Sequence, residues 1–64
     1  MNTTPRPTIL VLDDDPGVVD FLCESLEERG FATTGVTSPK HALALIQHQT
    51  FDLVVTDVEM PEMR

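Results

Sequence analysis

Four aspartates follow two apolar segments of this 64-residue chain, and their placement suggests a site for a cation. Asp13, Asp14 and Asp15 follow the apolar residues 9–12, and Asp57 follows the apolar stretch 51–56. Like charges that gather at one place are costly unless a cation is bound among them. These residue types and their spacing therefore indicate a divalent-metal site, with chemistry on one aspartate.

The rest of the sequence predicts the elements that position these aspartates. We expect strands over about residues 8–13, 31–36 and 51–57, and helices over about residues 16–29 and 39–49. Asp15 suits the N-cap of the first helix and Gly30 its C′ position, while Ser38 suits the N-cap of the second helix. The predicted order is therefore β-α-β-α-β.

This order predicts an α/β fold with a parallel sheet. The first and third strands are apolar on both faces and suit interior positions, whereas the second, with two threonines and a glycine, suits an edge. The strand order is then 2-1-3, and right-handed crossovers place the helices on opposite faces. Open α/β sheets bind ligands at the carboxyl ends of strands where the winding reverses, which is where the four aspartates are expected.

Composition limits the classes of function. A net charge of −7 with only four Lys and Arg residues argues against direct binding to nucleic acid or an anionic membrane. No apolar stretch approaches the roughly 18 residues of a membrane span. Cys23 is the only cysteine, which excludes an internal disulfide and fits a reducing compartment. Residues 1–7 lack the apolar core of a signal peptide and are expected to be a disordered lead-in. We expect a cytoplasmic unit.

Two segments carry a resemblance to a known family. Ile9-Leu10-Val11-Leu12-Asp13-Asp14-Asp15-Pro16 and Leu53-Val54-Val55-Thr56-Asp57-Val58-Glu59-Met60-Pro61 resemble the two signature segments of response-regulator receiver domains in two-component signalling. The resemblance in strand order and spacing covers essentially the whole chain. It implies a partial flavodoxin-like (CheY-like) β-α-β-α-β unit with three parallel strands.

The resemblance also implies roles for individual residues. Asp57 would be the phospho-acceptor, taking a phosphoryl group from a sensor histidine kinase or a small acyl phosphate. Asp14 and Asp57 would bind Mg²⁺ (or Mn²⁺) directly, Asp13 would bind it through water, and Glu59 would contribute its backbone carbonyl. Oxygen ligands suit Mg²⁺, and a carboxylate is a competent nucleophile. Such a protein is a signalling receiver, not an enzyme, although a complete domain catalyses its own aspartyl phosphorylation.

The chain also departs from the family pattern. The family fold has five strands, and residues 8–64 correspond to its N-terminal half. The fourth-strand hydroxyl residue and the fifth-strand lysine and aromatic residue have no counterpart here. We therefore expect a truncated fragment that is a poor phospho-acceptor and cannot switch. An uncovered edge on the third strand is expected to cause homodimerisation or larger self-association.

Other interpretations remain open at this stage. The three consecutive aspartates could serve only as a helix N-cap cluster. Asp13 and Asp15 form an Asp-x-Asp, as in haloacid-dehalogenase-like phosphotransferases, but Pro16 and Gly17 do not continue that pattern. A calcium loop needs alternating ligands, which consecutive aspartates do not provide. An interaction or structural fragment without chemistry is the remaining alternative.

Overall fold

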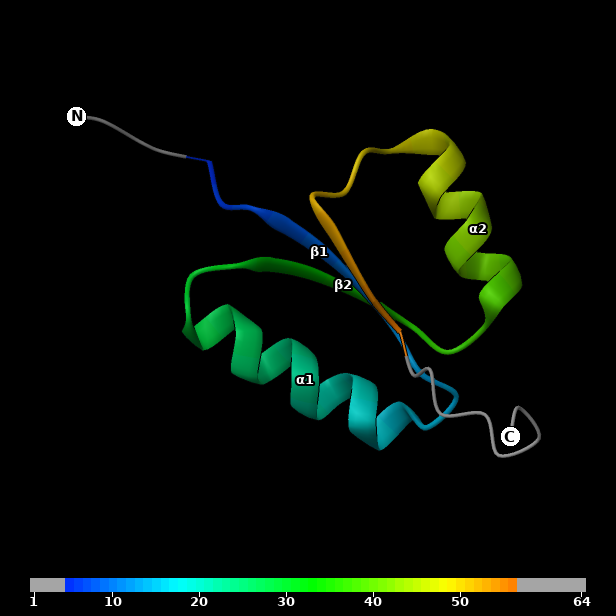
Figure 1. The fold of residues 1–64 in the computed structure, drawn as a ribbon. Coiled ribbons are helices and arrows are strands. Elements are labelled where there is room, and N and C mark those ends of the chain that lie inside the picture. Colours follow the sequence, from blue (N-terminus) through cyan, green and yellow to red (C-terminus); the bar gives the residue numbers. More distant parts are fainter. Residues whose placement is uncertain (1–4, 57–64) are drawn as a thin grey trace, which may run out of the picture.

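The computed structural model describes residues 5–56, which form three strands and two helices in the predicted alternating order (Figure 1). The elements are β1 (Thr8–Leu12), α1 (Pro16–Glu28), β2 (Ala32–Val36), α2 (Pro39–His48) and β3 (Leu53–Thr56). Residues 5–7 form neither helix nor strand. The division into a lead-in over residues 1–7 and a domain over residues 8–64 extends beyond the described residues and stays a prediction.

The helix ends follow the local sequence. Asp15 is the N-cap of α1, and its Oδ1 accepts a hydrogen bond from the Gly17 backbone N–H at 2.9 Å. Ser38 caps α2 and accepts from the His41 backbone N–H at 3.4 Å. Gly30 has a φ of 99°, a left-handed conformation that favours glycine and ends α1. All three capping predictions are confirmed.

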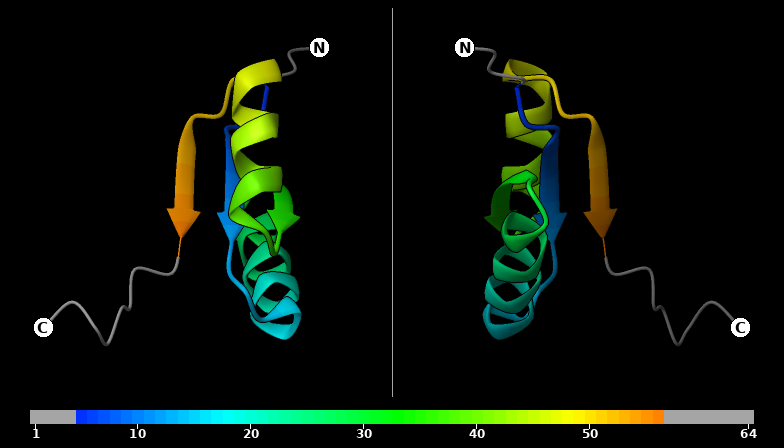
Figure 2. Two further views of the ribbon diagram at one scale, coloured as in Figure 1. Left: turned by 90° about the vertical axis from the view of Figure 1, so that its right-hand side faces the viewer. Right: turned by 90° about the vertical axis from the view of Figure 1, so that its left-hand side faces the viewer.

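The three strands form a parallel sheet in the order β2-β1-β3. The two helices lie on opposite faces of this sheet (Figure 2). These observations confirm the predicted partial flavodoxin-like arrangement, including the 2-1-3 order. The register pairs Leu12 of β1 with Val36 of β2 and with Thr56 of β3, so the carboxyl ends of the strands lie side by side.

The central strand β1 supplies the most deeply buried side chains, Leu10 and Val11, both with 0% exposure. Successive strand residues point to opposite faces, so β1 contributes to two separate clusters. The α1-side cluster contains Ile9, Val11 and Val19, and the α2-side cluster contains Leu10, Val36 and Ala42. Burial of apolar surface on both faces of β1 is therefore what holds the helices to the sheet.

Gly35 of β2 allows α1 to approach the sheet closely. A Cβ atom at this position would clash with Cγ1 of Val19 and lie only 3.0 Å from Sγ of Cys23. Cys23 is half-buried and packs against the α1-side cluster as a small apolar side chain. The glycine thus serves packing and not a turn.

The strand β3 has the uncovered edge that the 2-1-3 order predicts, although its apolar composition suits an interior position. In the described sheet it is an edge, and neither helix covers it (Figure 2). Leu53 and Val54 are 55% and 42% exposed, and only Val55 is half-buried. Ile46, whose spacing from Ala42 fits the inner face of α2, is also exposed because α2 packs on β1 and β2 and leaves β3 uncovered.

The length and apolar character of the two helices determine whether either could span a bilayer. Neither α1 nor α2 is long and apolar enough to cross a membrane.

Candidate functional site

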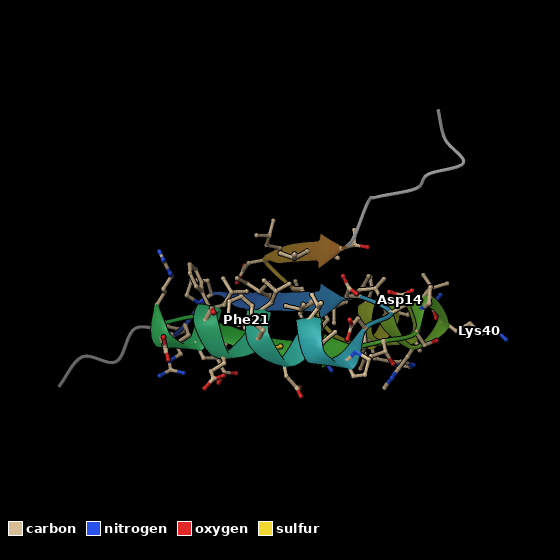
Figure 3. The ribbon with its side chains drawn as sticks, turned by 90° about the horizontal axis from the view of Figure 1, so that it is seen from below. Asp14, Phe21 and Lys40 are labelled. Carbon is tan, nitrogen blue, oxygen red and sulfur yellow. The ribbon has the colours of Figure 1, made fainter. Side chains whose placement is uncertain are left out.

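The loop after β1 holds the three consecutive aspartates at the carboxyl end of the sheet. The backbone N–H of Asp13 donates to the Val36 carbonyl oxygen at 3.2 Å, which extends the pairing with β2 by one residue beyond β1. Figure 3 shows Asp14 just past the end of β1. The sheet therefore fixes the start of this loop at the predicted switch point of the fold.

Two of the three aspartates use carboxylate oxygens to shape the loop. Asp13 Oδ1 accepts a hydrogen bond from the Asp15 backbone N–H at 2.9 Å. Asp15 Oδ1 accepts in turn from the Gly17 backbone N–H. Asp13 is half-buried, whereas Asp14 and Asp15 are exposed. The prediction that Asp15 acts as a helix cap is confirmed, and Asp14 is the exposed carboxylate between the two loop-forming residues.

The β1–β3 register bears directly on the proposed acceptor. Leu12 pairs with Thr56, and the next residues in the sequence are Asp13 and Asp57. Asp57 and Glu59 lie outside the described residues, so their predicted roles as acceptor and ligand stay predictions. Within residues 5–56, no group of three or more His, Cys, Asp or Glu side chains is arranged to hold a metal ion.

The donor chemistry of the described part fits the implied metal. Asp13 and Asp14 offer only carboxylate oxygens, the ligand type that Mg²⁺ and Mn²⁺ prefer. One Asp13 oxygen is engaged by the backbone, which leaves the other for a water or a cation. Lys40, at the start of α2, extends outward from this end of the molecule (Figure 3). Asp13 and Asp14 are thus compatible with a Mg²⁺ site that further oxygen ligands complete.

One polar contact was not predicted from the sequence. Thr8 and Asp52 hydrogen-bond to each other at the amino ends of β1 and β3, opposite the aspartate loop. The sequence contains a weak signal for this contact, since a polar residue directly precedes the apolar run in each strand. Asp52 was instead expected to be part of the third strand, which begins at Leu53 in the structure.

Comparisons with known proteins agree with this geometry. The family model for the response regulator receiver domain matches residues 9–64. An uncharacterized 14.6 kDa protein in the sodA1 3′ region of Leptolyngbya boryana is 43% identical over 63 residues, covering 98% of this chain and 48% of that protein. The response regulator receiver protein CpdR of Brucella abortus is 36% identical over 55 residues, covering 86% of this chain and 46% of that protein.

A solved structure extends the comparison to the fold. The chemotaxis response regulator CheY4 of Vibrio cholerae matches with a TM-score of 0.81 and 26% sequence identity. The match covers 89% of this chain and 48% of that one. This chain therefore spans about half the length of the relatives it matches.

Proposed function

The chain belongs to the response regulator receiver domain family, and we propose that its Asp57 accepts a phosphoryl group with Mg²⁺ bound by neighbouring aspartates. The observation that supports this most directly is the pairing of Leu12 with Thr56. This pairing ends two parallel strands at the same level, and an aspartate follows each strand in the sequence. The acceptor and the metal ligands are thus proposed to share one edge of the sheet.

Each residue has a distinct task in this proposal. An oxygen of Asp57 forms a bond to phosphorus while the bond from phosphorus to the donor breaks, and the donor leaves with that electron pair. Asp14 would bind the metal directly, Asp13 would bind it through water, and the Glu59 carbonyl would supply a further oxygen. A bound Mg²⁺ polarises the phosphoryl group and offsets the repulsion among the carboxylates. Asp15 holds the start of α1 in place.

The proposed phosphoryl donors are a sensor histidine kinase and small acyl phosphates. Donation from a kinase is supported by membership of the receiver family. We propose a cytoplasmic location, supported by the presence of a single cysteine. The absence of direct nucleic-acid and membrane binding through this segment is supported by the net charge of −7.

Intact-mass analysis after incubation with acetyl phosphate and Mg²⁺ tests the acceptor. We expect a small fraction of the chain to gain one phosphoryl group, none of Asp57→Asn to gain it, and Asp15→Asn, which keeps a side-chain oxygen for the helix cap, to gain it to the same extent as the parent. Phosphorylation that persists in Asp57→Asn would contradict the proposal. Phosphatase turnover that depends on Asp13, with Asp57 dispensable, would favour the dehalogenase-like alternative.

Self-association through β3 is the second proposal. The specific observation is that β3 is an edge of the described sheet with two exposed apolar side chains, Leu53 and Val54. Unpaired edge strands of this composition tend to pair with another chain. We propose a homodimer or larger assembly joined at this edge.

An interaction fragment with no chemistry is the alternative. The acetyl phosphate experiment separates it from the proposal, because an interaction fragment would show no modification at any Mg²⁺ concentration.

A further inference from the structure

Thr8 and Asp52 are joined by reciprocal hydrogen bonds at the amino ends of β1 and β3. The backbone N–H of Thr8 donates to Asp52 Oδ2 at 2.8 Å, and the Thr8 hydroxyl lies 3.2 Å from the same oxygen. In return, the backbone N–H of Asp52 lies 2.9 Å from the Thr8 carbonyl oxygen and 3.2 Å from Thr8 Oγ1. We call this set of contacts the Thr8–Asp52 clasp.

Apolar packing holds β3 only weakly in its register. Leu53 and Val54 are exposed, and Val55 is the one half-buried side chain of the strand, packed against the α1-side cluster. Both helices lie over β1 and β2 (Figure 2). The buried face that usually specifies strand register is therefore small here, and hydrogen bonds must supply much of the specificity.

A register shift would displace the far end of β3. Sliding by one residue moves the strand by about 3.3 Å and turns every side chain to the other face, so Val55 would leave its cluster. Sliding by two residues returns each side chain of β3 to its original face of the sheet but doubles the displacement of the strand. Mg²⁺ requires oxygen ligands at about 2.0–2.1 Å in near-ideal octahedral geometry. Neither shift is compatible with a metal site shared between the ends of β1 and β3.

We propose that the Thr8–Asp52 clasp fixes the register of β3 against β1 and thereby sets where the end of β3 lies relative to the loop of Asp13 and Asp14. This inference rests on the proposed function. Thr8 and Asp52 lie at the opposite end of the strand pair from the aspartate loop, so they act as positioning residues and not as ligands. A register shift at the clasp would slide all four paired residues of β3 along β1. It would therefore also displace the end of β3 that lies beside the aspartate loop.

Three variants separate the clasp from general stability. Asp52→Ala removes the carboxylate acceptor, whereas Asp52→Asn keeps an oxygen that can accept from Thr8 and removes only the charge. Thr8→Val removes the hydroxyl and keeps the backbone contacts. The matched control is Leu45→Ala, because Leu45 packs against the α2-side cluster and lies on α2, outside the strand pair and the aspartate loop. All are studied at a temperature where each is folded.

The first measurement determines the register of β3 against β1 in the absence of metal. Interstrand NMR contacts between β1 and β3 report which residues are paired. We expect the parent, Asp52→Asn and Leu45→Ala to show only the pairing of Leu10 with Val54 and its neighbours. Asp52→Ala is expected to show a second register or exchange-broadened signals confined to Leu53–Thr56, with a smaller effect in Thr8→Val. A single, unchanged register in Asp52→Ala would overturn the proposal.

The second measurement titrates the same variants with Mn²⁺. We expect Asp52→Ala to lose roughly tenfold in affinity, the size of effect typical when supporting residues of a metal site are removed. Asp52→Asn and Leu45→Ala are expected to retain the parent affinity. Equal loss in Asp52→Ala and Leu45→Ala would assign the clasp to stability alone. If the parent binds no Mn²⁺, the proposed function fails, and the register measurement still decides whether the clasp sets the pairing.

Discussion

The three neighbouring aspartates after β1 have the same side chain and different surroundings. Asp13 is half-buried and turns one oxygen toward the Asp15 backbone N–H, and Asp15 turns one toward Gly17. Asp14 is exposed between them. Adjacent residues of one type therefore divide into two loop-forming positions and one exposed position, and substitution of each should affect a different property.

Metal affinity should depend on Asp14 more than on Asp15. We expect Mg²⁺ or Mn²⁺ to bind with a dissociation constant of about 1 mM, equivalent to about −4 kcal/mol. Asp14→Asn should weaken this binding, whereas Asp15→Asn should change it little, because Asp15 caps α1. Isothermal titration of both variants checks the difference. Unchanged binding in the double variant Asp14→Asn, Asp57→Asn would remove the proposed site.

The free energy of unfolding, in contrast, should depend on Asp15 more than on Asp14. Asp15→Ala removes the N-cap acceptor of α1 and should lower the free energy of unfolding by about 1 kcal/mol. Asp14→Ala, at an exposed loop position, serves as the control and should change stability by less than about 0.5 kcal/mol. Urea denaturation followed by circular dichroism measures both. Equal destabilisation by the two substitutions would contradict the division of roles.

At the scale of helices and strands, local signals in the sequence predicted the fold well. Capping residues such as Asp15 and Ser38 act on adjacent backbone groups, so their effects are visible in a short stretch of sequence. The polarity difference between β1 and β2 is likewise visible within each short segment, and it predicted the strand order. These features need no knowledge of distant contacts.

Contacts between distant residues were harder to predict. The exposure of Leu53 and Val54 depends on what lies beside β3, which its composition does not specify. The Thr8–Asp52 clasp joins residues 44 positions apart and has no periodic pattern. In the candidate site, the loop positions of Asp13 to Asp15 follow from the strand end, while the roles of Asp57 and Glu59 still rest on the family resemblance.

The contact between α1 and β2 gives a prediction at this scale. Gly35→Ala should destabilise the protein by about 1–3 kcal/mol, because the new methyl group would crowd Val19 and Cys23. The cost should fall in a Val19→Ala background, where Cγ1 is absent. A double-mutant cycle measured by thermal unfolding determines this coupling. Additive effects of the two substitutions would show that α1 shifts to accommodate the methyl group.

At the scale of the whole molecule, charge and apolar exposure oppose each other. The net charge of −7 disfavours association between copies. The exposed apolar residues on α1, α2 and β3 favour it, with Phe21 at 66% and Leu43 at 57% the most exposed. Association should therefore strengthen as salt screens the repulsion between copies.

Sedimentation velocity at tens of micromolar tests the proposed assembly through β3. We expect a dimer or larger species for the parent chain, and more of it at higher salt. Val54→Lys places a charge on the exposed face of the edge strand and should shift the equilibrium toward monomer, since charged residues on edges block strand pairing. Leu43→Lys is the matched control, because it adds the same charge at an exposed apolar residue of α2, which is not part of the β3 edge. A parent chain that sediments as a monomer at all salt concentrations would rule out the assembly. Equal dissociation by both lysine variants would show that net charge, and not the strand edge, controls association.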